Sequence, residues 1–243
     1  MPGAPLSLVS RLRPLRTLPF RAADLAGTRA SRLGERRGHD WLVYNPLTMW
    51  SYHRLARRDA GPVMDAIRRV FPDVSDAIDV GAGSGAFAAA GRRLGMNVRA
   101  LERSRAGRLF ATAQRVPAHA FDLRAGAGTG ERAQLAYCFE VAEHLDPALG
   151  ERLVAFLADA APIVVFTAAH PGQGGYGHIN EQPRGYWLDR FRAHGMQPWP
   201  EAADALARAF AGNGVDGPWF AENLLVLRAG PAPPGRVQPH RDA

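Results

Sequence analysis

The sequence predicts an α/β fold, in which short buried strands alternate with longer amphipathic helices. Three observations support this prediction. Short apolar runs such as residues 135–139 and 163–166 alternate with helix-like segments. A glycine-rich loop at residues 81–85 separates one strand from the helix that follows it. The chain has 243 residues, which is enough for one well-cored domain and short for two.

The first half of the chain supplies an alternating series of elements. Apolar residues recur at helical spacing in residues 46–58 and 61–71, which predicts two helices there. The elements expected next are a strand at 77–80, a helix at 86–94 after the glycines, a strand at 97–102, a helix at 105–114 and a strand at 118–122.

The second half continues the same alternation. Residues 135–139 and 163–166 are uninterrupted apolar runs, which is typical of central strands covered on both faces. An amphipathic pattern predicts a helix at 147–159 between them. After a long glycine-rich loop at 169–182, the remaining expected elements are a helix at 184–194 and a closing strand at 223–227.

Basic charge is concentrated near the amino terminus. The formal net charge of the chain is +7, and eight arginines against Asp24 and Glu35 give residues 1–38 a charge of +6. The remaining residues are therefore nearly neutral, which argues against nucleic acid as a partner. We expect a flexible Arg-rich arm at 1–38, a folded domain at 39–229 with a helical cap at 39–71, and a disordered Pro-rich tail at 230–243. Two alternatives for the arm remain open, a contact with a membrane surface or a partner, and a targeting role.

Cysteine content and hydropathy limit the remaining classes. Cys138 is the only cysteine, so the chain has no internal disulfide and no multi-cysteine metal site, and we expect Cys138 to be an inert core thiol. No apolar run is long enough to span a membrane, and arginines interrupt any secretory signal. A cytoplasmic location fits these features.

The glycine-rich loop has the character of a cofactor-binding turn. Glycines let backbone N–H groups approach a ligand, and the start of a helix favours a negative group. The stretch can be aligned with the G-x-G-x-x-A pattern of NAD-binding proteins. Glu102 ends the next strand, where a carboxylate can accept hydrogen bonds from both ribose hydroxyls. The loop itself reads Asp79-Val80-Gly81-Ala82-Gly83-Ser84-Gly85.

D-V-G-A-G-S-G followed by L-E-R resembles the first two motifs of class I S-adenosylmethionine-dependent methyltransferases, and the resemblance covers about residues 60–230. It implies a single Rossmann-like domain with a mostly parallel seven-stranded sheet and helices on both faces. Asp79 favours this cofactor over NAD, because S-adenosylmethionine carries cationic groups where NAD carries a diphosphate. The residues that the resemblance places on the cofactor are Asp79, Gly81, Ala82, Gly83 and Gly85 at the methionine end, Glu102 at the ribose and Asp122 at the adenine.

A second cluster of polar residues follows the fourth strand. Glu140, Glu143 and His144 are spaced i, i+3 and i+4, so one helical turn would point them the same way. Two carboxylates and an imidazole in one place suit a divalent cation.

This E-x-x-E-H element resembles that of the ubiquinone-pathway O-methyltransferases and the small-RNA 3′-terminal 2′-O-methyltransferases, in which it helps to hold a magnesium-type ion. The resemblance implies a further histidine after the fifth strand, and His178 in G-H-I-N-E matches it better than His170. Glu140, Glu143, His144 and His178 are therefore the candidate catalytic residues and the candidate Mg²⁺ ligands. Two alternatives remain open, a metal-free site in which His144, His170 or His178 is the general base, and a purely structural role.

Two segments are candidates for acceptor contacts. The loop 169–182 is long for a connector and is interpreted as a substrate lid, with Trp187 in the core behind it. The aromatic segment that contains Trp41, Tyr44, Trp50, Tyr52 and His53 is either a cap over the sheet edge or a cover over the acceptor pocket. The lid residues expected to face the acceptor are Tyr176, His178, Asn180 and Gln182.

The sequence as a whole predicts an S-adenosylmethionine-dependent methyltransferase that acts on a hydroxyl of a small molecule, a sugar or a lipid-linked metabolite. Three alternatives are weaker: an RNA-end 2′-O-methyltransferase, a non-catalytic cofactor-binding subunit and an NAD-linked oxidoreductase. The oligomeric state is not predicted.

Overall fold

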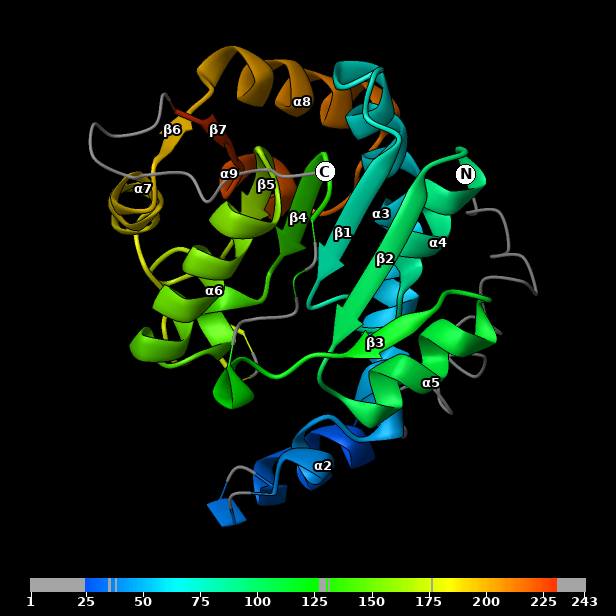
Figure 1. Ribbon diagram of the computed structural model, residues 1–243. Helices are drawn as coiled ribbons and strands as arrows, with labels where there is room; N and C mark the ends of the chain where they lie inside the picture. Colours follow the sequence, from blue (N-terminus) through cyan, green and yellow to red (C-terminus); the bar gives the residue numbers. More distant parts are fainter. Residues whose placement is uncertain are drawn as a thin grey trace, which may run out of the picture.

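The computed structural model describes residues 25–34, 36–37, 39–126, 130, 132–175 and 177–230. Within them the chain forms a seven-stranded sheet with helices on both faces (Figure 1). The predicted arm up to residue 24 and the predicted tail after residue 230 lie outside the described residues. Among the residues described, no helix combines the length and apolar character needed to cross a bilayer.

The sheet confirms the predicted mostly parallel arrangement. Its strand order is β3-β2-β1-β4-β5-β7-β6, and every pairing is parallel except the two made by β7. The carboxyl ends of β1, β2 and β4 therefore meet at one edge. The strands are β1 (Asp76–Val80), β2 (Asn97–Glu102), β3 (Ala118–Ala120), β4 (Leu135–Phe139), β5 (Ile163–Thr167), β6 (Met196–Pro198) and β7 (Leu225–Ala229).

Helices cover the two faces of the sheet and bury two apolar cores. One core joins the sheet to α3, α4, α5, α8 and α9, and the other joins it to α6 and α7. Trp187 and Cys138 lie in the second core, as predicted. The helices are α2 (Asp40–Val43), α3 (Pro46–Val70), α4 (Ala86–Arg93), α5 (Arg105–Ala113), α6 (Pro147–Ala160), α7 (Arg184–Ala193), α8 (Pro200–Asn213) and α9 (Trp219–Glu222), with short 3-10 turns η1 (Leu123–Ala125) and η2 (Ala142–His144).

The long helix α3 corrects the prediction of two helices at 46–58 and 61–71. It runs for 25 residues without a break, although Pro62 lies inside it. Pro62 removes one helical N–H donor. Met49 before the proline and Met64 after it are both buried, so packing along the whole helix outweighs the missing bond.

The amino-terminal arm is also different from its prediction, because residues 25–34 are helical. Ser31 is fully buried, and its hydroxyl donates to Val43 O at 2.6 Å. Asn45 caps α3 by accepting from Leu47 N and Thr48 N, and its amide donates to Gly27 O at 3.2 Å. A buried polar network therefore fastens this helix to the start of α3.

The carboxyl-terminal part of the fold contains elements that the sequence did not predict. These are the three-residue strand β6 and the helices α8 and α9. The closing strand β7 begins at Leu225, two residues later than expected, and β3 ends at Ala120 rather than at residue 122.

Candidate functional site

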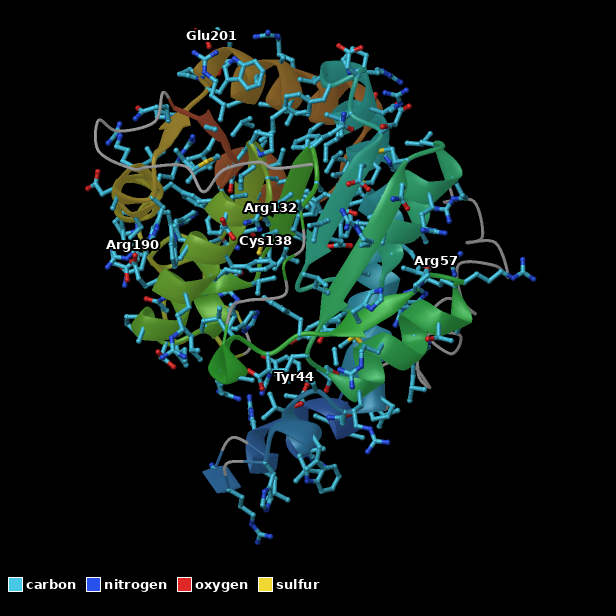
Figure 2. All side chains as sticks on the ribbon, viewed as in Figure 1. Tyr44, Arg57, Arg132, Cys138, Arg190 and Glu201 are labelled. Atoms are coloured by element: carbon cyan, nitrogen blue, oxygen red, sulfur yellow. The ribbon has the colours of Figure 1, made fainter. Side chains whose placement is uncertain are left out.

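A cavity of about 680 Å³ opens at the carboxyl ends of β1, β2 and β4. Its walls come from the glycine loop, the segment after β4, the loop after β5, and the amino-terminal helices. Tyr44 lies on the side toward which the carboxyl ends of β1 and β2 point (Figure 2). One cavity thus joins the two clusters that the sequence predicts separately.

The glycine loop has a backbone that requires glycine. Gly81, Gly83 and Gly85 have φ angles of +74°, +52° and +75°, in the left-handed region. A Cβ on Gly81 would lie 2.6 Å from Val141 Cγ2, and one on Gly85 would lie 2.7 Å from Ala111 Cβ. Gly81, Ala82 and Gly83 line the cavity, whereas Gly85 forms the turn behind it.

Glu102 connects the end of β2 to this loop. Its Oε2 accepts a hydrogen bond from Gly83 N at 2.7 Å, and its Oε1 accepts one from Ser104 N at 2.6 Å. Burial raises the pKa of Glu102, and the two backbone bonds oppose that shift. The two backbone bonds therefore fix the orientation of the carboxylate at the cavity wall. A fixed carboxylate of this kind can accept hydrogen bonds from the two hydroxyls of a diol.

Asp79 is the most unusual residue of the loop. It is 3% exposed, and its Oδ2 has no hydrogen-bond partner among the described residues. Burial raises the pKa of Asp79 to about 8; the Ala88 N–H and the Tyr137 hydroxyl oppose the shift, and the negative charge of Glu102 adds to it. Since Asp79 also lines the cavity, a cationic ligand there would supply the missing partner.

Asp122 lies just beyond β3 and completes the row of three acidic residues at successive strand ends. Its carboxylate accepts from Arg124 N at 2.9 Å, which caps η1 and fixes the side chain at the wall. The predicted cofactor residues other than Gly85 therefore border one space.

The metal-type cluster contains three of the four predicted residues. Glu143, His144 and His178 each offer one ligand atom, and these atoms lie within 4.8 Å of one another. Glu143 is fully buried, and neither of its carboxylate oxygens has a hydrogen-bond partner among the described residues. Burial, together with the charge of nearby Glu140, raises the pKa of Glu143 well above its usual value.

The two histidines of the cluster are oriented by bonds on their Nδ1 atoms. His144 Nδ1 lies 3.1 Å from Gly177 O, so it is the protonated nitrogen and donates. His178 Nδ1 lies 2.8 Å from Glu181 Oε1, whose carboxylate also accepts from two backbone N–H groups in the same loop. Burial lowers the pKa of His144 to about 4, so this ring is neutral at physiological pH. Metal-binding histidines are commonly held in this way.

Glu140 is not one of the three residues whose ligand atoms gather within 4.8 Å, although its carboxylate is close enough to Glu143 to raise the pKa of that group. Its φ of +53° takes it out of any helical turn with Glu143 and His144, so the i, i+3 spacing does not apply. Its carboxylate instead accepts from Gln173 Nε2 at 3.1 Å and from Asn223 Nδ2 at 3.1 Å. Glu140 and Gln173 still line the cavity.

The loop after β5 contributes to the wall less completely than predicted. His178 lines the cavity, but Asn180 is buried behind it and Gln182 donates to Asn180 Oδ1. His170 is exposed and does not line the cavity, which weakens it as a general base. Tyr176 lies outside the described residues.

The amino-terminal helices form the far wall of the cavity, in agreement with the pocket-cover interpretation. Tyr44, Met49 and Tyr52 line it. His53 Nδ1 lies 2.9 Å from Ser84 Oγ and so ties α3 to the glycine loop. Trp41, in contrast, is 69% exposed.

Sequence reasoning missed several of the cavity-lining residues. Phe139, Trp219 and Phe220 form an aromatic wall, and Gln173 and Asn223 hold Glu140. Trp219 and Phe220 belong to the unpredicted α9, so no local motif could have revealed them.

Comparison with known proteins gives matches only at the level of structure. No protein-family model matches the sequence, and a search of curated proteins found no match. The structure is similar to the sugar N-methyltransferase KedS8 from Streptoalloteichus, with a TM-score of 0.54 and 17% identity over 71% of this chain and 87% of that one. It is also similar to an O-methyltransferase family protein from Burkholderia thailandensis, with a TM-score of 0.58 and 12% identity over 81% and 64%.

A third similar structure is the mitomycin 7-O-methyltransferase MmcR, with a TM-score of 0.56 and 17% identity over 85% of this chain and 62% of that one. The chain has the class I methyltransferase fold. In this fold the cavity lies where open α/β sheets bind their ligands, outside the carboxyl ends of the strands.

Proposed function

We propose that the protein is an S-adenosylmethionine-dependent methyltransferase that methylates a hydroxyl of a small molecule, a sugar or a lipid-linked metabolite with the help of a divalent cation such as Mg²⁺. One observation carries the proposal: a cofactor-type glycine loop and a cation-type cluster face the same cavity. The class I methyltransferase fold supports the cofactor assignment.

The chain's own groups fit the cofactor at each end. Asp79 would pair with the cationic methionine end and would be ionised in that pair, since its Oδ2 has no hydrogen-bond partner among the described residues. Glu102 and Asp122 line the same cavity, where Glu102 would accept from the ribose hydroxyls and Asp122 would lie at the adenine side. Gly83 leaves open the space that a Cβ would occupy, since no atom lies within 4 Å of that position.

Glu143, His144 and His178 would hold the cation. The donor set of one carboxylate and two imidazoles suits several divalent ions, and both oxygens of Glu143 are buried without a hydrogen-bond partner among the described residues. When bound, S-adenosylmethionine supplies an activated methyl group and the cation lowers the pKa of an acceptor hydroxyl. The protein contributes orientation, because Gly177 and Glu181 fix the histidine rings and α3 closes the acceptor side.

A labelling assay tests the activity. Purified protein is incubated with methyl-labelled S-adenosylmethionine and separate pools of small molecules, glycans, lipids and RNA, with magnesium or with EDTA. We expect label in a small-molecule, glycan or lipid pool that disappears with EDTA. Label only in RNA would reject the acceptor class, and transfer that EDTA does not affect would remove the cation from the proposal.

The cation site has a separate test by thermal unfolding. Mg²⁺ or Mn²⁺ should raise the melting temperature of the wild-type protein, because a ligand that binds only the folded state stabilises it. The Glu143→Gln variant should lose this increase, while Asp204→Asn, a change of an exposed carboxylate on α8, should keep it. An equal increase in all three proteins would contradict a site at Glu143.

A further inference from the structure

The amino-terminal helices expose an unusual number of large apolar side chains. Of the eight large hydrophobic residues that are exposed in the described chain, four lie between residues 25 and 47. They are Leu25, Leu33, Trp41 and Leu47, with exposed fractions of 53%, 42%, 69% and 42%. We call the exposed side chains of Leu25, Arg29, Arg32, Leu33, Arg36, Arg37, Trp41 and Leu47 the amino-terminal surface.

Arginines are interleaved with these apolar side chains. Arg29, Arg32, Arg36 and Arg37 are all exposed. Leu25, Arg29 and Arg32 are spaced i, i+4 and i+7, which places them along one side of the helix at residues 25–34. Four more arginines precede them in residues 1–24, outside the described residues.

The inner side of the same helix is fixed in place. Ser31 and Gly34 face the chain at residues 39–48, where a Cβ on Gly34 would lie 2.7 Å from Leu42 Cβ. Asn45 donates to Gly27 O at 3.2 Å and to Ser31 Oγ at 3.2 Å, which holds the two segments together. The leucines and arginines of the outer side are therefore presented by a packed structure.

The chemistry of this surface selects a partner that is both apolar and anionic. Leucine and tryptophan side chains gain from entering the acyl boundary of a bilayer, and arginines gain from anionic headgroups. A nucleic acid would bind the arginines but would leave the exposed leucines in water. We propose that the amino-terminal surface binds the protein peripherally to anionic phospholipid membranes.

The position of the amino-terminal surface determines which side of the protein would face the membrane. The amino-terminal helices project beyond the carboxyl ends of β1 and β2 (Figure 1), and Tyr44 and Met49 from the same segment line the cavity. A bound membrane would therefore lie on the cavity side of the sheet. The consequence that a membrane-borne acceptor reaches the cavity directly rests on the proposed function, whereas membrane binding itself does not.

Vesicle flotation of the full chain tests the proposal, without S-adenosylmethionine or acceptor. We expect binding to vesicles of phosphatidylcholine mixed with phosphatidylglycerol, little binding to phosphatidylcholine alone, and weaker binding at high salt. The double variants Leu33→Ser/Trp41→Ser and Arg29→Glu/Arg36→Glu should each lower the partition coefficient at least about tenfold.

Control variants distinguish binding through this surface from non-specific adsorption to vesicles. Leu94→Ser and Arg208→Glu change an exposed leucine and an exposed arginine elsewhere on the molecule, and both should bind vesicles like the wild type. A circular-dichroism melt of each variant verifies that the fold is retained.

Three results would overturn the proposal. The first is equal or absent binding to neutral and anionic vesicles. The second is binding of random-sequence RNA that the Arg29→Glu/Arg36→Glu variant loses and the Leu33→Ser/Trp41→Ser variant keeps, with no vesicle binding. The third is a dimer that dissociates in the Leu33→Ser/Trp41→Ser variant, which would assign the surface to a second copy of the chain.

Discussion

Asp79 and Glu143 are two carboxyl groups that the fold buries without satisfying all their oxygens. A buried polar group without a hydrogen bond costs about 1–3 kcal/mol, so each reduces the stability of the folded chain. Both line the cavity. We interpret them as groups whose partners arrive from solution, a cationic ligand for Asp79 and a metal ion for Glu143.

The raised pKa of Asp79 predicts how its replacement changes stability with pH. Because its pKa in the folded protein is about 8 and its ordinary value is 3.8, the folded state binds the proton more tightly. The free energy of unfolding therefore falls as pH rises from about 4 to about 8. The Asp79→Asn variant lacks this contribution, so its stability relative to wild type should grow from pH 5 to pH 8, by up to about 1.4 kcal/mol per pH unit.

Urea unfolding at pH 5 and pH 8 measures that difference. The same variant should bind S-adenosylmethionine more weakly, since the amide carries no charge to pair with the cationic end. A constant stability difference at both pH values would show that Asp79 is ionised throughout and would reject the assigned protonation state.

Gly175 controls the position of His178. A Cβ on Gly175 would lie 2.1 Å from His178 Nε2, so the Gly175→Ala variant should displace the ring. We expect this variant to lose the rise in melting temperature with Mg²⁺ or Mn²⁺ and to melt within a few degrees of wild type in EDTA. Gly185→Ala is the matched control, because no atom lies within 4 Å of its Cβ position. A full metal response in Gly175→Ala would show that His178 is not a ligand.

At the scale of elements, the sequence predicted best what local patterns determine. The strands β1, β4 and β5 are short apolar runs, and the turn after β1 is marked by its glycines, so their positions along the chain could be predicted. The break in α3 was wrong because Gly61-Pro62 is a local signal that packing along the whole helix overrides. The position of Glu140 was wrong because a left-handed φ at a non-glycine residue has no sequence signature.

Asn45 joins the helix at residues 25–34 to the start of α3, so we expect these two segments to open together. Its carbonyl oxygen caps α3, while its amide donates to Gly27 O and Leu42 O. The Asn45→Ala variant should lose about 1–2 kcal/mol, as expected for a lost helix cap. Hydrogen exchange should then accelerate in residues 25–34 and 46–49 and remain unchanged in β4. Uniform acceleration across the chain would contradict a local network.

At the scale of the whole molecule, some parts of the site could be predicted from the sequence and others could not. Asp79, Glu102 and Asp122 could be placed together because successive parallel strands end at the same edge. The aromatic wall of Trp219 and Phe220 could not, since these residues arrive through α9, far from any motif. The amino-terminal segment was predicted from composition alone, which reveals its arginines and conceals the polar network at Ser31.

The reactivity of Cys138 can report how often the sheet opens. This single thiol is fully buried at the middle of the sheet, and burial raises its pKa well above the ordinary value. A thiol reagent can therefore react only with molecules whose sheet has opened. The rate constant of modification, followed by absorbance, should equal the equilibrium constant for opening multiplied by the rate constant for a free thiol. S-adenosylhomocysteine at a hundred times its dissociation constant should slow the modification about a hundredfold, and slowing by less than twofold would mean that local motion exposes Cys138 without releasing the ligand.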